Sequence, residues 1–325
     1  MSDLYFAGVD LGGTSIKLGI GDGQGELLAT RSIPTDAHEG PDKVIQRITD
    51  GILELSGEVG KPLAAVGLGA PGLIDVPSGT TKFLPNLPTQ WVDVPLGRVL
   101  TEQFRCPVMV ANDARTATLG ELKFGWGKER DNLTLAFFTL GTGVGGGVAI
   151  DGKLRLGELG AAGELGHQTI DPNGLRCGCG NRGCLETLVS APAITGEAVR
   201  LMRSGQAPLL HEACQGDVQN LNIEAMMQVI ENEKSVREVI VRAAKYLGVA
   251  VANVVTTIHP DLIVLGGGVA EIGELLTKTI KEEITWRVGM FPTENVEVKK
   301  SQLGVNAGIL GALGLAMLAH ENKPT

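Results

Sequence analysis

A glycine-rich stretch with three cysteines and one histidine constrains the fold of this chain more than any other segment. Cys177, Cys179 and Cys184 have C-x-C-x4-C spacing, and His167 lies ten residues before the first of them. Three thiolates and one imidazole complete the tetrahedral ligand set of a closed, structural Zn²⁺ site. Because glycines between the thiols allow the tight turns of such a knuckle, we expect these four residues to bind a structural Zn²⁺ and to hold the loop 163–186.

Two other interpretations of these cysteines are a disulfide bond and separate buried thiols. Separate thiols fit the regular spacing poorly, and a reducing cytosol argues against a disulfide. Cys106 and Cys214 show no partner pattern, so we interpret them as ordinary core or surface residues.

Two carboxylates flank the expected zinc ligands. Glu164 stands three residues before His167, and Glu186 stands two residues after Cys184. Metal binding would therefore fix both carboxylates, and the second ring nitrogen of His167 could face a ligand. This set of donors and acceptors suits a polyhydroxylated molecule.

Length and composition limit the class of protein to which this chain can belong. A chain of 325 residues predicts two domains, and 43% hydrophobic residues with only 4% aromatic ones indicate aliphatic cores. The net charge of −9 argues against a nucleic-acid partner. The beginning of the chain has no basic run or apolar segment of a signal peptide, and the apolar tract 247–258 is short and interrupted by Asn253 and Thr256. We expect a soluble, cytoplasmic protein without a membrane partner.

The chain repeats one layout of strands and glycine turns. An apolar run at 5–9 leads into the turn 10–14, and an alternating strand follows. The same order recurs with a strand at 134–140, a glycine run at 141–147 and a further strand. This repetition suggests a duplicated domain.

Strands and helices alternate along the rest of the chain, which predicts an α/β class with helices on both faces of the sheets. We place the domain border near Asn112, with a small N-terminal α/β domain at 1–112 and a large domain with the zinc loop at 113–304. A C-terminal helix at about 305–325 would pack back on the first domain. The helical spacing covers 41–59, 93–104, 114–122, 193–202, 223–230, 234–254, 269–280 and 306–318, and further strands are expected at 65–68, 107–110 and 261–265.

Three glycine turns follow predicted strands and could bind phosphate through backbone amides. In the turn 10–14, the carboxylate of Asp10 would require a cation such as Mg²⁺ beside a phosphate, although this turn alone is more typical of an ordinary hairpin. The runs 142–147 and 266–268 are the second and third turns. Together they favour a nucleotide, while the absence of G-x4-G-K-[ST] excludes a Walker-type site.

Asn112 and Asp113 directly follow the predicted strand 107–110, at the end where α/β sheets bind ligands. An ordinary aspartate has a pKa of about 3.9, so at neutral pH it is ionised and can accept a proton. Asp113 could also cap the helix that begins at Ala114. The two roles are compatible.

Taken together, these motifs resemble the ROK family of repressors, open reading frames and sugar kinases, in particular its bacterial glucokinases, within the actin-like ATPase superfamily. The resemblance covers nearly the whole chain. Its motifs are DLGGT at 10–14, GAPG at 69–72, PNLPTQW at 85–91, AND at 111–113, LGTGVGGG at 140–147, GELGH at 163–167, CGCGNRGCLE at 177–186 and GGG at 266–268.

The resemblance implies a duplicated actin-like (ribonuclease H-like) fold with two domains that flank a cleft. It also implies transfer of a phosphoryl group from ATP to the 6-hydroxyl of a hexose, most simply glucose, with ATP, Mg²⁺ and a structural Zn²⁺ bound. Asp113 would be the catalytic base. The hexose would bind to Asn86, Asn112, Asp113, Glu164, His167 and Glu186, and the nucleotide to Asp10, Gly12, Gly13, Thr14, Thr142, Gly143, Gly145, Gly266, Gly267 and Gly268.

Two other functions share these motifs. A kinase for N-acetylmannosamine or N-acetylglucosamine differs only in the room around the substituent at C2, which the sequence does not define. A sugar-responsive repressor would carry a DNA-binding segment before the kinase-like part, whereas only nine residues precede Asp10 here. By the same resemblance, we expect a homodimer or a higher homo-oligomer.

Overall fold

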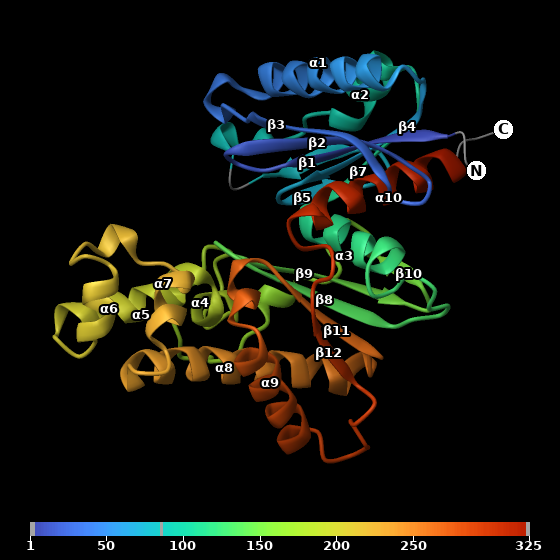
Figure 1. Ribbon diagram of the computed structural model, residues 1–325. Coiled ribbons are helices and arrows are strands. Elements are labelled where there is room, and N and C mark those ends of the chain that lie inside the picture. Colours follow the sequence, from blue (N-terminus) through green and yellow to red (C-terminus); the bar gives the residue numbers. More distant parts are fainter. Residues whose placement is uncertain (1–3, 85–86, 323–325) are drawn as a thin grey trace. The chain divides into compact units, whose positions relative to one another are not determined.

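The computed structural model describes residues 4–84 and 87–322 (Figure 1). Contacts between residues divide the chain into two compact units, and each is described by itself. Unit 1 comprises Met1–Asn132, Gly147–Gly163 and Ser301–Thr325, and unit 2 comprises Leu133–Gly146 and Glu164–Lys300.

Unit 1 is built on a five-stranded sheet of order β3-β2-β1-β4-β7. The first three strands form the expected antiparallel meander, and β4 and β7 continue the sheet in parallel. The strands are β1 (Tyr5–Leu11), β2 (Ser15–Asp22), β3 (Leu27–Pro34), β4 (Leu63–Ala70) and β7 (Val108–Asn112), with a separate hairpin of β5 (Leu73–Asp75) and β6 (Thr80–Phe83).

One face of this sheet carries large aliphatic side chains. Val9, Leu18 and Leu68 are fully buried there, in one core with residues of α1 (Pro41–Val59) and α2 (Leu96–Phe104). Helix α1 has the bounds that its helical spacing predicts, because Pro41 occupies its first turn and Gly60 ends it in the left-handed conformation at φ 69°.

The opposite face carries glycine at alternate positions, which lets a helix approach the backbone closely. Gly8, Gly19 and Gly67 face α10 (Ala307–Glu321), and a Cβ atom on Gly67 would lie 1.9 Å from the Ala312 carbonyl oxygen. Helix α10 also packs against α3 (Asp113–Phe124). Because the glycines remove the Cβ layer, the C-terminal helix packs on the first sheet (Figure 1).

We expect Gly311→Ala to destabilise unit 1. A Cβ atom there would lie 1.9 Å from the Thr116 carbonyl oxygen, where α10 crosses α3. Overpacking of this kind costs about 1–3 kcal/mol, which urea unfolding followed by circular dichroism measures. The control is Gly57→Ala in α1, where nothing lies within 4 Å of the added carbon, so stability should be unchanged or slightly higher. Equal unfolding midpoints for the two variants would contradict the close crossing.

The second sheet has the order β10-β9-β8-β11-β12, with β8, β11 and β12 parallel. The position of each strand matches that of its counterpart in the first sheet, as the repeated layout predicts. Strands β8 and β11 are buried at almost every position, as is typical of sheets covered on both faces. The strands are β8 (Leu135–Leu140), β9 (Val144–Ile150), β10 (Lys153–Arg155), β11 (Leu262–Gly266) and β12 (Glu297–Lys300).

Strands β8, β11 and β12 belong to unit 2, and helices make up most of the rest of this unit. Helix α8 packs against α4, α5 and α9. The helices are α4 (Glu186–Val189), α5 (Ala191–Arg203), α6 (Pro208–Ala213), α7 (Ile223–Val229), α8 (Lys234–Ile258) and α9 (Glu274–Arg287).

The borders between the units lie after Asn132, Gly146, Gly163 and Lys300, whereas the first border was expected after residue 112. Helix α3 packs against β4, β7 and α10 and therefore belongs to unit 1. Two helix starts also differ by more than two residues. Helix α2 begins at Leu96, after Asp93 with φ 55° and Pro95 at the N-cap, and α9 begins at Glu274 because a 3-10 turn at Gly268–Ile272 precedes it.

The apolar tract 247–258 forms the end of the longer helix α8. This helix of 25 residues is long and apolar enough to cross a membrane by length and composition alone. Its most apolar window is 61% buried inside the protein. Helix α8 is therefore the core helix of unit 2.

Candidate functional site

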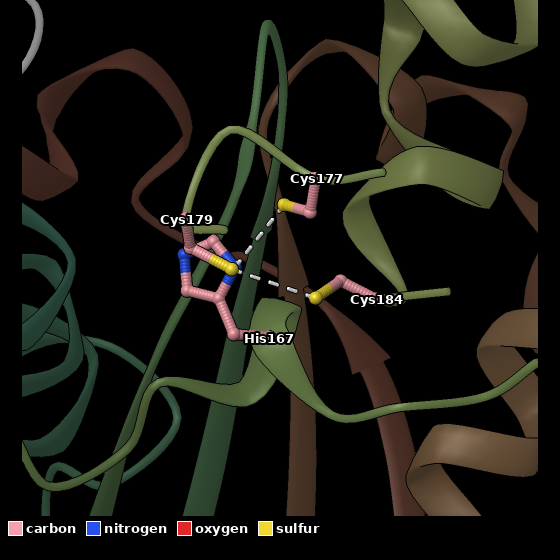
Figure 2. A group of neighbouring side chains, drawn as sticks. All are labelled: His167, Cys177, Cys179 and Cys184. Carbon is pink, nitrogen blue, oxygen red and sulfur yellow. Dashed lines mark hydrogen bonds between the residues drawn. The ribbon is translucent and has the colours of Figure 1, made fainter. Parts of the chain in front are cut away.

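Unit 2 brings the three cysteines of the knuckle and His167 together (Figure 2). The four ligand atoms lie within 4.8 Å of one another. Cys177 Sγ is 3.7 Å from His167 Nδ1, and Cys179 Sγ is 3.6 Å from Cys184 Sγ. Ligand atoms of a tetrahedral zinc site lie about 3.5–3.8 Å apart, given the usual Zn–S and Zn–N bond lengths. The donor set and its spacing therefore fit a structural Zn²⁺.

The same distances exclude a disulfide in the knuckle, since bonded sulfurs lie about 2.05 Å apart and all five cysteines are free thiols. Burial raises the pKa of the Cys177 and Cys184 thiols, whereas a backbone N–H of Asn181 lowers the pKa of Cys179. A cation among the sulfurs would favour the thiolates.

Backbone bonds shape the knuckle around the thiols. Cys177 N–H donates to the Asn181 carbonyl at 2.8 Å, and Gly180 N–H donates to the Cys177 carbonyl at 3.0 Å. Gly183 has φ 64°, and a Cβ atom there would lie 1.5 Å from the Asp171 carbonyl oxygen. Only glycine fits this position. Its close approach to Asp171 therefore fixes the backbone between the second and third cysteines.

The two ring nitrogens of His167 have different partners. Its Nδ1 atom points toward the sulfurs, while Nε2 lies 3.8 Å from Glu164 Oε2. A metal on Nδ1 would leave the proton on Nε2. The imidazole would then be a fixed donor next to a carboxylate, as expected for binding hydroxyl groups.

Glu186 connects the knuckle to the second glycine turn. Its Oε2 atom accepts a hydrogen bond from Val144 N–H at 2.9 Å, and its Oε1 atom lies 3.5 Å from Cys177 Sγ. A Cβ atom on Gly143 would lie 2.6 Å from Oε2, so a larger residue here would push the Glu186 carboxylate aside. One expected hexose ligand thus contacts the turn expected to bind phosphate.

The second and third glycine turns also lie together in unit 2. Thr142 and Gly143 follow β8, Gly145 lies in β9, and Gly266 ends β11 beside Thr139 of β8. Gly267 has φ 84°, and a Cβ atom there would lie 2.4 Å from the Leu140 carbonyl oxygen. Gly268 begins the 3-10 turn. Adjacent strands therefore bring the two turns to one end of the sheet.

In unit 1, the first glycine turn joins β1 and β2. Gly12 N–H donates to the Ser15 carbonyl at 3.0 Å, and Thr35 N–H donates to the Thr14 carbonyl at 2.9 Å, while Gly13 and Thr14 are exposed. Asp10 is half-buried beside the start of α10, and burial raises the pKa of its carboxyl while Lys17 lowers it. The turn keeps exposed backbone close to a carboxylate, as a phosphate and Mg²⁺ site requires.

Asn112 and Asp113 stand where β7 ends and α3 begins. Asn112 caps the helix, since its Oδ1 atom accepts from Ala114 N–H at 2.9 Å and Arg115 N–H at 3.3 Å. The cap expected at Asp113 is therefore Asn112, and Asp113 is the first helical residue, half-buried, with Oδ1 2.8 Å from Ala114 N. A helix N-terminus favours a negative charge at this position. Asn86 lies outside the described residues.

Sequence reasoning did not identify Arg115, which is 1% exposed and donates to the side chain of Asn112. No motif or spacing marks this arginine, because it stands among small residues of an ordinary helix. Its burial is visible only once the loop around Ala161 and Ala162 is placed against α3.

Comparison with known proteins agrees with these features. The family model described as "ROK family" matches residues 6–319. A glucokinase of Thermotoga maritima is 36% identical over 323 residues, which cover 97% of this chain and 98% of that protein. A xylose repressor of Caldicellulosiruptor bescii is 30% identical over 315 residues, which cover 95% of this chain and 77% of that protein.

Among solved structures, a ROK family glucokinase from Streptomyces griseus in complex with glucose and AMPPNP superposes with a TM-score of 0.82. It is 32% identical and covers 97% of this chain and 99% of that one. The resemblance seen in the sequence motifs is confirmed, and so is the α/β fold class. This chain is a member of the ROK family.

Proposed function

We propose that this protein is an ATP-dependent hexokinase that phosphorylates glucose at its 6-hydroxyl. The observation that carries the proposal is the hydrogen bond of 2.9 Å between Glu186 and Val144 N–H. It joins the knuckle, with its carboxylates and imidazole, to the glycine turn 142–147, so that a polyol and a phosphate would be neighbours. The similar glucokinases support the same reaction.

In this proposal, Asp113 takes the proton of the attacking hydroxyl. Asn86, Asn112, Glu164, His167 and Glu186 bind the other hydroxyls. The glycine turns at 12–14, 142–147 and 266–268 bind the nucleotide, with Mg²⁺ near Asp10. Phosphoryl transfer has a loose transition state, so these groups act mainly by positioning and by neutralising charge.

The structural Zn²⁺ at His167, Cys177, Cys179 and Cys184 is part of the same proposal. When bound, it would hold the loop in one conformation and direct Nε2 of His167 away from the metal. We also propose that the protein forms a homodimer or higher homo-oligomer, as the family resemblance suggests.

A coupled assay of ADP release with glucose, mannose, N-acetylglucosamine and N-acetylmannosamine tests the function. We expect glucose to have the highest kcat/KM and 6-deoxyglucose to give no turnover. A preference for an N-acetylated sugar would replace glucose by an N-acetylhexosamine as the substrate. Sugar binding without any ADP release would overturn the kinase and favour a regulator, as in the similar xylose repressor.

A further inference from the structure

Arg115 is a charged side chain buried in unit 1, two residues after Asp113. It is 1% exposed and lies in the first turn of α3. A guanidinium stays protonated at any physiological pH, and burying it is costly unless its N–H groups are hydrogen-bonded. The hydrogen bonds of this buried arginine must therefore offset the cost of burying its charge.

Its hydrogen bonds connect two segments that flank the N-terminus of α3. Nη1 donates to Asn112 Oδ1 at 3.1 Å. Nε donates to the Ala162 carbonyl at 2.8 Å, and Nη2 donates to the Ala161 carbonyl at 3.0 Å. The planar fork of the guanidinium holds both segments in one orientation, which a flexible lysine would do less well.

The hydrogen bond from Arg115 determines which atoms of the Asn112 side chain remain for a ligand. Its Oδ1 atom accepts three hydrogen bonds, from Ala114 N–H, Arg115 N–H and Arg115 Nη1. Its Nδ2 atom donates to the Gly72 carbonyl at 3.0 Å. An amide oxygen has two lone pairs and the nitrogen two hydrogens, so only one N–H of Nδ2 remains for a further acceptor.

We propose that Arg115 is a positioning residue of the hexose site: it locks the Asn112 carboxamide with its oxygen toward α3 and presents one N–H to a sugar oxygen. It also clamps the backbone at Ala161 and Ala162 to the end of α3 where Asp113 lies. This assignment rests on the proposed function. It implies that the hydroxyl bound by Asn112 accepts a hydrogen bond from it and cannot donate one.

The test compares three variants by steady-state kinetics with glucose and ATP. Arg115→Met removes the charge and all donors, and Arg115→Lys keeps the charge without the fork. Asn112→Asp keeps a helix cap but replaces Nδ2 by an oxygen, so it loses both the bond to the Gly72 carbonyl and the remaining N–H. We expect Arg115→Met and Asn112→Asp to raise the KM for glucose about 10- to 100-fold, which is the worth of one lost or misplaced hydrogen bond to a buried group. The KM for ATP should change less than threefold, and Arg115→Lys should lie between Arg115→Met and the wild type.

Glu121 provides the matched control on the same helix. It is fully buried, and its Oε1 atom accepts from Leu303 N–H at 3.2 Å and from Ser301 Oγ. Glu121→Gln removes a buried charge two turns from Asp113, so it should lower the melting temperature without a change in the KM for glucose. A general loss of stability is thereby separated from a loss of positioning.

A double variant makes the coupling between Arg115 and Asn112 measurable. If Arg115 acts through the carboxamide, Arg115→Met adds no more than about threefold to the KM of Asn112→Asp, because contacting residues are not additive. Full additivity, or an unchanged KM for glucose in Arg115→Met, would overturn the assignment while the hexokinase stands. If Arg115→Met does not fold, a glucose KM within threefold of wild type in Asn112→Asp would overturn it. Wild-type protein without turnover on any hexose would overturn both.

Discussion

Asp113→Asn is expected to lower kcat by about 10²–10⁴-fold, because a positioned general base contributes this much to a rate. Asp113 stands at the first position of α3, directly after β7. Asparagine has the same shape but cannot accept the proton of an attacking hydroxyl. Since the amide keeps the hydrogen-bonding geometry, the dissociation constant for glucose, measured by titration calorimetry, should stay within about fivefold of wild type.

Asp217→Asn serves as the matched control for this prediction. The Asp217 carboxylate also bonds a nearby backbone N–H, that of Gln219 at 2.9 Å, but it caps an exposed 3-10 turn. Its substitution should leave kcat unchanged. A kcat within tenfold of wild type for Asp113→Asn would show that Asp113 is not the base.

Removing the metal is the second change with a large expected effect. Cys184 is fully buried in the knuckle, and Cys184→Ser should reduce zinc content from one atom per chain to nearly none by elemental analysis. Without the proposed metal the loop would lose the bond to His167, and the neighbouring Glu164 and Glu186 would no longer be held in place. We expect kcat/KM for glucose to fall at least about 100-fold, since misplacement of about 1 Å costs this much.

Cys214→Ser separates metal loss from the loss of any buried thiol. Cys214 is equally buried but lies outside the knuckle, so this variant should keep its zinc and its activity. Chelation of the wild-type protein should reproduce the phenotype of Cys184→Ser, and added Zn²⁺ should restore activity. A fully active Cys184→Ser variant without metal would contradict a structural role for zinc.

Sequence reasoning predicted the convergence of the knuckle because cysteine spacing reports directly on ligand geometry. It identified the glycine turns for a similar reason, since glycine marks places where a backbone approaches another group, as Gly143 does at Glu186. The contact between Glu186 and Val144 N–H was not predicted. It joins residues 42 positions apart, and no local pattern in a sequence records such a distance.

The fold was predicted correctly where the helical spacing agrees with the residues that begin and end a helix, as in α1 between Pro41 and Gly60. It was predicted less well where tertiary packing decides. Helix α3 belongs to unit 1 because glycines on the sheet and on α10 allow close contact, and the helical spacing of α3 itself does not reveal this. The short strands β5, β6 and β12 carry too few residues for a clear alternation.

Helix α10 has a consequence for how the protein is made. It covers the face of the sheet that contains Gly8 and Phe6, yet about 300 residues separate these positions from Leu313. At about 5–20 residues per second, a ribosome adds that length in roughly 15–60 s. During this time most of unit 2 is synthesised, while the first sheet waits with one face in water. We therefore expect nascent chains that stop before residue 307 to be captured by chaperones and to become resistant to protease only when the last helix has emerged.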